Sequence, residues 1–169
     1  MAYNRTNMVS LLDIGLLFKG SKSNIVEMGD GFSEIKEEWN PEKDSKTYVN
    51  MESASNSVKG YGLNIAAERD YLSDEMQTAI DDMLKKFPTG EECETYYYRF
   101  FKTDLTGNTG DCIRVPVVAC ASDVGGNGGE TLASSIQISG NGNSELGTIT
   151  ISDSGFAWAA KTASKANAS

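Results

Sequence analysis

The chain has 169 residues, with 24 acidic and 15 basic side chains, a formal net charge of -9 and no histidine. A chain of this length can form one domain with a buried core, and its negative charge argues against a protein that grips phosphate backbones. The absence of histidine excludes Ser-His-Asp and Cys-His catalysis and the usual zinc sites.

Residues 1–24 are expected to form an N-terminal arm. The stretch from Met8 to Phe18 is mostly apolar and is interrupted by Asp13 and Gly15. It must therefore pack against something, either the chain's own domain or a neighbouring subunit. It lacks the basic leader and cleavage site of a secretory signal, and it is too short to span a bilayer.

A strand broken by a turn at residues 29–31 is expected over residues 25–39. In its second half the side chains alternate, so that Glu34, Lys36 and Glu38 share one face. Because this face is charged, it should meet solvent.

Residues 40–57 are polar and begin with the turn-forming pair Asn40-Pro41. Tyr48, Val49 and Met51 are the isolated apolar residues within them. The segment is predicted to be a long loop or a loose hairpin, and connections of this length in small domains are usually functional or disordered. We expect it to be an inter-subunit loop.

A helix is predicted over residues 73–87, after a strand over residues 58–69. Ser73 suits the N-cap, and acidic residues in the first turn and lysines in the last favour the helix dipole. One amphipathic helix cannot bury its apolar stripe alone, so the stripe should lie on a sheet. The stripe comprises Met76, Ile80, Met83, Leu84 and Phe87.

Four further strands are predicted in hairpins, over residues 95–103, 113–121, 132–139 and 147–151. Residues 153–169 are expected to form a C-terminal segment outside the domain of residues 25–152. The predicted fold class is therefore mainly β, with two packed antiparallel sheets in a sandwich or barrel and one flanking helix.

The candidate chemical sites are weak. Residues 125–132 (GGNGGETL) resemble one calcium-binding nonapeptide unit with Glu130 in place of the usual Asp, but that architecture needs tandem copies. Two acidic clusters resemble paired glycosidase carboxylates, yet such clusters are usually solvated surface. Three cysteines without a C-x-x-C pair indicate free thiols. We expect no enzyme activity, no cofactor and no metal. The cysteines are Cys93, Cys112 and Cys120, and the acidic clusters are Glu34, Glu37 and Glu38, and Glu91, Glu92 and Glu94.

Three stretches carry a resemblance to a known family. The first is EIKEEWNPEKDSKTYVN followed by SVKGYGLNI, the second is GLNIAAERDYLSDEMQTAIDDMLKKF followed by ETYYYRFF, and the third is ASSIQISG followed by ELGTITIS. In order and texture, over roughly residues 25–152, they are similar to the tail tube proteins of tailed bacteriophages.

The resemblance implies a virion protein, made in the host bacterial cytoplasm, whose hexameric rings stack into the tail tube. It implies partners that include further copies of the chain, the tape measure protein and the tail terminator and initiator proteins. Phage DNA would pass through without specific binding, and Glu34, Lys36 and Glu38 are our candidates for the lumen face. Tubes of type VI secretion and contractile injection systems remain open, and the chief rival is a carbohydrate-binding or adhesive β-module.

Overall fold

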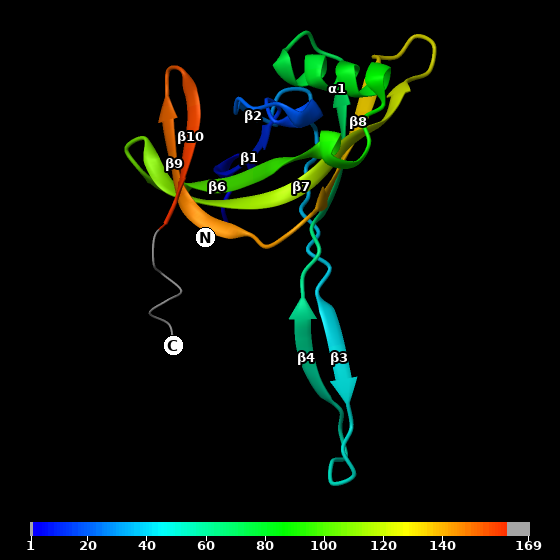
Figure 1. The fold of residues 1–169 in the computed structure, drawn as a ribbon, viewed down its shortest axis with the longest axis vertical. Coiled ribbons are helices and arrows are strands. Elements are labelled where there is room, and N and C mark those ends of the chain that lie inside the picture. Colours follow the sequence, from blue (N-terminus) through cyan, green and yellow to red (C-terminus); the bar gives the residue numbers. More distant parts are fainter. Residues whose placement is uncertain (1, 162–169) are drawn as a thin grey trace.

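The structure is a computed structural model in which residues 2–161 are described (Figure 1). One helix, α1 (Glu75–Lys86), and three short 3-10 turns accompany the strands. The strands are β1 (Met8–Asp13), β2 (Ile25–Glu27), β3 (Glu42–Lys46), β4 (Ser55–Gly60), β5 (Asn64–Asp70), β6 (Glu94–Thr106), β7 (Thr109–Gly125), β8 (Ala133–Gly140), β9 (Glu145–Ser152) and β10 (Gly155–Ala160).

Eight of these strands form one antiparallel sheet, which with α1 is called the body below. Its main path runs β10-β9-β7-β6-β1-β2. The long strand β7 pairs with β9 along its first half and with β8 along its second half, and β5 pairs with β8. The predicted class, mainly β and antiparallel with one helix, is confirmed. The second sheet is the two-stranded β3–β4 hairpin.

The first half of the body closes around a large core. Residues 25–28 pair with β1, where the Met28 amide donates to the Ser10 carbonyl, and residues 32–38 then bridge to β5. This segment thus links the two ends of the path β1-β6-β7-β8-β5. The enclosed core includes the fully buried Ile65, Ile136 and Ile138 from β5 and β8, together with the apolar side of α1.

Helix α1 is shorter than the predicted range of residues 73–87, and its N-cap lies one residue later than expected. Asp74, rather than Ser73, is the N-cap, and its side chain accepts from the Gln77 amide. Phe87 adopts a left-handed conformation at the C-cap (φ 48), and its side chain is 72 % exposed, so it lies outside the stripe that the spacing predicted. A residue beyond the last helical turn no longer follows the 3.6-residue period, which explains the difference. Met76, Ile80 and Met83 are buried in the core, and Leu84 is half-buried against it.

The second half of the body has a separate, more aromatic core. Its buried members lie on β1, β6, β7 and β9, and the β9–β10 hairpin adds Phe156 and Trp158 at its margin. Gly147 makes this packing possible, because a Cβ there would lie 2.4 Å from the Trp158 ring. Strand β10 was not predicted, because residues 153–169 contain mostly small side chains. Residues 162–169 of that segment lie outside the described residues.

The N-terminal segment is not an arm. Strand β1 lies between β6 and β2 in the sheet, and Leu11 and Leu12 are fully buried on its opposite faces. Of the two packing partners that the apolar run allowed, the chain's own domain is therefore the one found. Asp13 ends the strand as a buried acceptor for the amides of Gly15 and Asn24.

Candidate functional site

The most prominent surface feature is the hairpin of β3 and β4, which projects from the body along the long axis of the molecule (Figure 1). Its tip, residues 47–54, carries Tyr48, Val49 and Met51 with exposed fractions of 57 %, 109 % and 38 %. These are the residues that the sequence singled out for an inter-subunit loop. The body leaves them uncovered, so their apolar surface is available to another molecule.

The root of the hairpin is held by backbone hydrogen bonds. Glu38 and Asn64 exchange amide-to-carbonyl bonds of 3.0 and 2.7 Å, and the Gly62 amide donates to the Trp39 carbonyl at 2.8 Å. Asn40 takes a left-handed conformation (φ 40) immediately before Pro41, which turns the chain out of the body and into β3. The hairpin therefore continues the edge formed by β5 and residues 32–38.

A buried carboxylate lies just behind this root. Glu37 accepts hydrogen bonds from the Tyr97 hydroxyl at 2.9 Å and the Trp39 indole at 3.0 Å, and its carboxylate lies 3.4 Å from the Arg99 Nε. The Ser10 hydroxyl lies 2.9 Å from the Tyr97 oxygen and donates to it. Burial, followed by the nearby Glu37 charge, raises the pKa of Tyr97 well above its usual value. The raised pKa keeps the Tyr97 hydroxyl protonated and able to donate to Glu37, as a structural network requires.

The three candidates for a lumen face do lie together. Glu34, Lys36 and Glu38 are exposed and line one groove with the outward residues of β5, while Ile35 and Glu37 point into the body. This is the side of the β5–β8 sheet that α1 does not cover, and we call it the helix-free face. The other residues of that groove are Ser33, Asn64, Ala66 and Glu68.

Across β8 and β7 the helix-free face continues with small or polar exposed residues, among them Cys120, Gln137 and Ser139. The groove over β5 holds three carboxylates and one lysine. The face is therefore polar and net acidic, which suits contact with water or with a polyanion that must not adhere.

On the helix side, a clamp joins β5 to α1. Arg69, 1 % exposed, donates to both Asp74 carboxylate oxygens at 3.0 and 2.7 Å and to the Asp30 carbonyl at 3.0 Å. These hydrogen bonds from Arg69 are the main cause of the lowered pKa of Asp74. Because Asp74 is also the N-cap, one carboxylate fixes both the start of the helix and its position on the sheet.

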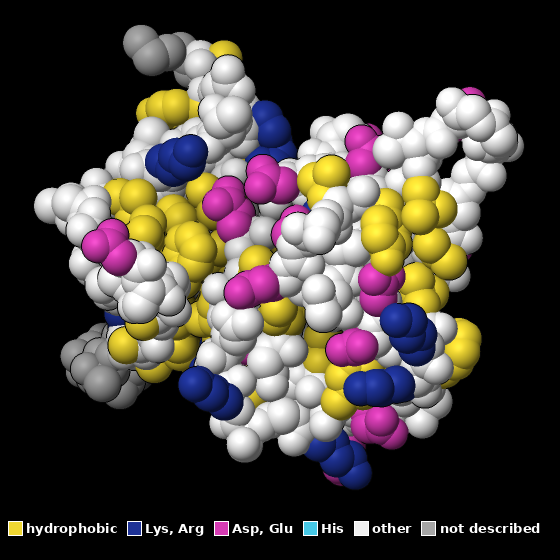
Figure 2. Space-filling model, turned by 90° about the horizontal axis from the view of Figure 1, so that it is seen from above, with side chains coloured by type: hydrophobic (Ala, Val, Ile, Leu, Met, Phe, Trp, Pro, Cys, Tyr) yellow, Lys and Arg dark blue, Asp and Glu magenta, His cyan; other side chains and the backbone are white. Residues whose placement is uncertain are grey.

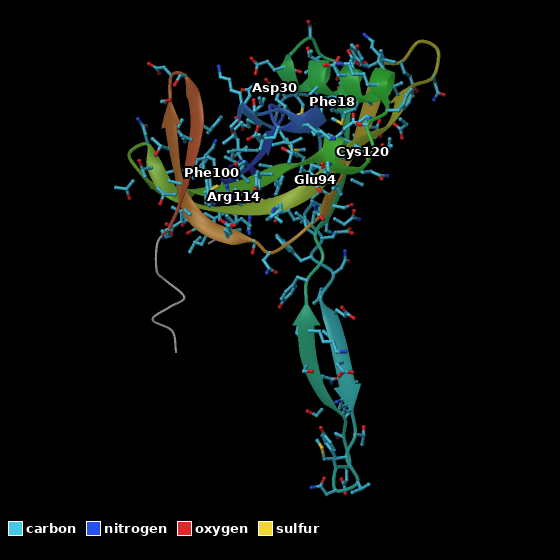
Figure 3. The ribbon with its side chains drawn as sticks, viewed as in Figure 1. Phe18, Asp30, Glu94, Phe100, Arg114 and Cys120 are labelled. Carbon is cyan, nitrogen blue, oxygen red and sulfur yellow. The ribbon has the colours of Figure 1, made fainter. Side chains whose placement is uncertain are left out.

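Sequence reasoning missed an aromatic pocket on the second half of the body. Arg114, labelled in Figure 3, has its guanidinium carbon 4.4 Å from the centre of the Tyr96 ring and 4.0 Å from that of Trp158, and it pairs with Glu145 at 2.8 Å. A cavity of about 410 Å³ between β2 and β10 is lined by Arg114 and by the aromatic residues Tyr96, Tyr98, Phe156 and Trp158. The dense aromatic run at residues 96–101 was a signal, but its partner Trp158 lies on the unpredicted β10.

Within residues 2–161 no group of three His, Cys, Asp or Glu side chains is placed to hold a metal ion. Cys93 and Cys112 are buried and Cys120 is exposed, and all three are free thiols. No helix in this part of the chain is long and apolar enough to cross a membrane.

Comparisons with known proteins inform on the fold alone. No family model and no curated protein matches the sequence. Among solved structures, the chain superposes on a protein of the tail of an empty gene transfer agent particle with C6 symmetry, with a TM-score of 0.60 and 11 % identity, over 86 % of this chain and 98 % of that one.

Two further structures share the fold. A protein of the native gene transfer agent virion gives a TM-score of 0.59 at 10 % identity, over 86 % of this chain and 98 % of that chain. A protein in the sheath/tube terminator of an extracellular contractile injection system, PVC, gives 0.52 at 6 % identity, over 86 % and 96 %. The chain therefore has the fold of proteins that build the tails of phage-like particles.

Proposed function

We propose that this chain is a structural tail protein whose hexameric rings stack into a tube, as in the tail of a phage or phage-like particle. The observation that carries the proposal is the likeness to a protein of a C6-symmetric tail, which extends over 98 % of that protein. Such a protein works as a polymer, so it needs assembly surfaces rather than a catalytic centre. The projecting hairpin supports this proposal, because an exposed apolar tip serves no purpose in a solitary domain.

The helix-free face is the proposed lumen wall, with Glu34, Lys36 and Glu38 on it. Its charge is net acidic and its other side chains are small or polar. Such a wall would repel the phosphates of DNA in transit. Because acidic side chains do not displace the cations bound to DNA, contact would release no counterions and would bring no gain in free energy. The tape measure protein, as the lumen's other occupant, and the terminator and initiator proteins at the tube's ends belong to the same proposal.

Ring stacking is assigned to the tip of the β3–β4 hairpin. Tyr48, Val49 and Met51 are exposed at the end of the longest projection of the molecule. Burial of apolar area contributes about 25 cal/mol per Å², and each ring–ring joint would repeat the contact six times. Weak individual contacts therefore add up to a stable tube.

Sedimentation velocity of the purified chain tests the proposal. A tube protein should pass from the 18.2 kDa chain to a six-fold species of about 109 kDa, six copies of that mass, and then to polymers as its concentration rises. A chain that stays monomeric at all concentrations would overturn the proposal.

A tube terminator is a second candidate. The likeness to a protein in a sheath/tube terminator favours it. A terminator stops the growth of a tube. Sedimentation velocity would therefore show a discrete ring and no polymer larger than that ring.

The aromatic pocket favours a third candidate, a carbohydrate-binding module. Tyr96 and Trp158 offer ring faces of the kind that stack on sugars, and Glu145 and Arg114 offer polar partners. Glycan-array binding by the dilute monomer, lost on Trp158→Ala, would support this candidate over the tube.

A further inference from the structure

A second group of exposed apolar side chains lies at the opposite end of the body from the hairpin. Tyr71, Leu72, Val124 and Leu132 are 37 %, 39 %, 50 % and 45 % exposed. They are neighbours, because the Tyr71 amide donates to the Leu132 carbonyl at 2.8 Å and the end of β7 pairs with the start of β8. We call these four residues the end patch. Figure 2, which looks down on this end, shows hydrophobic side chains gathered beside a projecting loop.

Strand β5 connects the two surfaces. Its first residue, Asn64, is bonded to the hairpin root, and its last, Asp70, pairs with Ala133 beside the end patch. The six steps from Asn64 to Asp70, at about 3.3 Å each, place the root and the end patch about 20 Å apart. The hairpin extends away from the end patch beyond the root (Figure 1). A hairpin tip therefore cannot reach the end patch of its own chain.

The geometry points to the end patch as the receptor for the hairpin tip of a second copy of this chain. A projection at one end and an apolar surface at the other form a heterologous, head-to-tail contact, which extends into a filament unless rotation closes it. This inference rests on the proposed tube, in which ring stacking is such a contact. It adds the surface that receives the tip.

Charge supports the same occupant. The end patch is bordered by the exposed acidic residues Asp70 and Asp123. Lys46 stands where β3 meets the tip, and its side chain is exposed. Lys46 at the base of the tip can pair with these carboxylates, while Glu52, exposed within the tip, has to face away from them in such a contact. By contrast, the groove of the helix-free face is lined mostly by polar and charged residues, with Ala66 as its one apolar lining residue, and gives the tip little apolar contact.

A disulfide-trapping experiment tests the assignment. In a Cys120→Ser background, which removes the exposed native thiol, the pair Val49→Cys and Leu132→Cys is oxidised under assembly conditions. We expect a ladder of covalent multimers on a non-reducing gel, because each copy carries one thiol of each kind. The single variants should give dimers at most.

A matched control pairs Val49→Cys with Ala157→Cys. Ala157 is exposed and lines the aromatic pocket on β10, another apolar site on the body. Tubes seen by electron microscopy without a ladder from the 49/132 pair, or a ladder only from the 49/157 pair, would overturn the assignment and leave the tube standing. Absence of any polymer from the Cys120→Ser chain would instead overturn the proposed function, and the inference with it.

Substitution gives an independent readout. Val49→Ser and Leu132→Ser should each raise the protein concentration needed for polymer formation by about tenfold or more. Tyr61→Ser, at an exposed position at the foot of the hairpin, should leave it within about twofold. An equal effect of all three variants would contradict a contact confined to the tip and the end patch.

Discussion

The first half of the body, which includes α1, and the β3–β4 hairpin differ in how far their side chains are buried. In the first half of the body, Ile65, Ile80 and Ile138 are fully buried, and the charged Arg69, 1 % exposed, is paired with Asp74. In the hairpin, by contrast, every residue of β3 and β4 except Asp44 and Gly60 is exposed. The body therefore supplies the stability of the fold, while the hairpin contributes little to it and is free to serve another copy of the chain.

The strongest test of this contrast is Ile80→Ala on the helix. Ile80 is 0 % exposed beneath α1, so removal of its side chain should lower the free energy of unfolding by about 3–4 kcal/mol. The matched control is Phe87→Ala, because Phe87 belongs to the same predicted apolar stripe but is exposed. This change should alter the free energy of unfolding by less than about 0.5 kcal/mol. Urea denaturation followed by circular dichroism measures both, and equal losses would contradict the exposed position of Phe87.

The next largest effect is expected for Asp74→Ala. The change removes the N-cap and leaves the buried Arg69 without its carboxylate, so the free energy of unfolding should fall by about 2–4 kcal/mol. Glu75→Ala, one residue further on and exposed, is the control and should cost less than about 0.5 kcal/mol.

Asp74 also gives the fold a pH dependence. Its pKa is lowered in the folded state, so its contribution to stability is present above the unfolded value, about 3.9, and is lost as the pH falls below it. Between pH 5 and pH 2 the wild type should therefore lose more stability than Asp74→Ala. Parallel loss in the two proteins would show that the clamp carries no such linkage.

Replacement of the hairpin, residues 42–60, by a short Gly-Ser turn should have the smallest effect on folding and the largest on assembly. Because its side chains are almost all exposed, the free energy of unfolding should change by less than about 1 kcal/mol, while polymers disappear from sedimentation profiles. Loss of the folded monomer, or normal tubes, would each contradict the division of labour between body and hairpin.

The reactivity of the three cysteine thiols tests which side chains of the body are buried. Burial raises the pKa of the Cys112 thiol to about 12, and Cys120 is exposed on the helix-free face. In the native monomer iodoacetamide should therefore modify Cys120 alone, with Cys93 and Cys112 reacting only after unfolding. In tubes, Cys120 should become slower to react if its face lines a closed lumen.

Local patterns predicted local structure well. Of the strand predicted over residues 58–69, residues 64–69 form most of β5, whereas residues 58–60 belong to β4. The 3.6-residue spacing of Met76, Ile80 and Met83 became the buried side of α1. The polar run at residues 40–57 was recognised as a long loop or loose hairpin, but not as part of a two-stranded element that ends at Gly60. In each successful case the signal lies within one element.

The failures share a physical cause, which is contact between distant segments. Strand β1 was predicted to be part of an arm, because no local pattern in residues 8–13 indicates that they pair with β6 some 90 residues later. The aromatic pocket depends on Arg114, Tyr96 and Trp158 from three strands, and the end patch joins residues 71–72 to residues 124 and 132. The spacing of apolar residues along the sequence does not indicate which distant segments will be in contact.

Electron cryomicroscopy of the wild-type chain at its highest soluble concentration tests the central claim most directly. We predict hollow particles of uniform diameter, six-fold in end-on views, with α1 outside, the helix-free face toward the lumen and each hairpin tip resting on a copy in the adjoining ring. Single domains with unoccupied hairpins at every concentration would contradict the account.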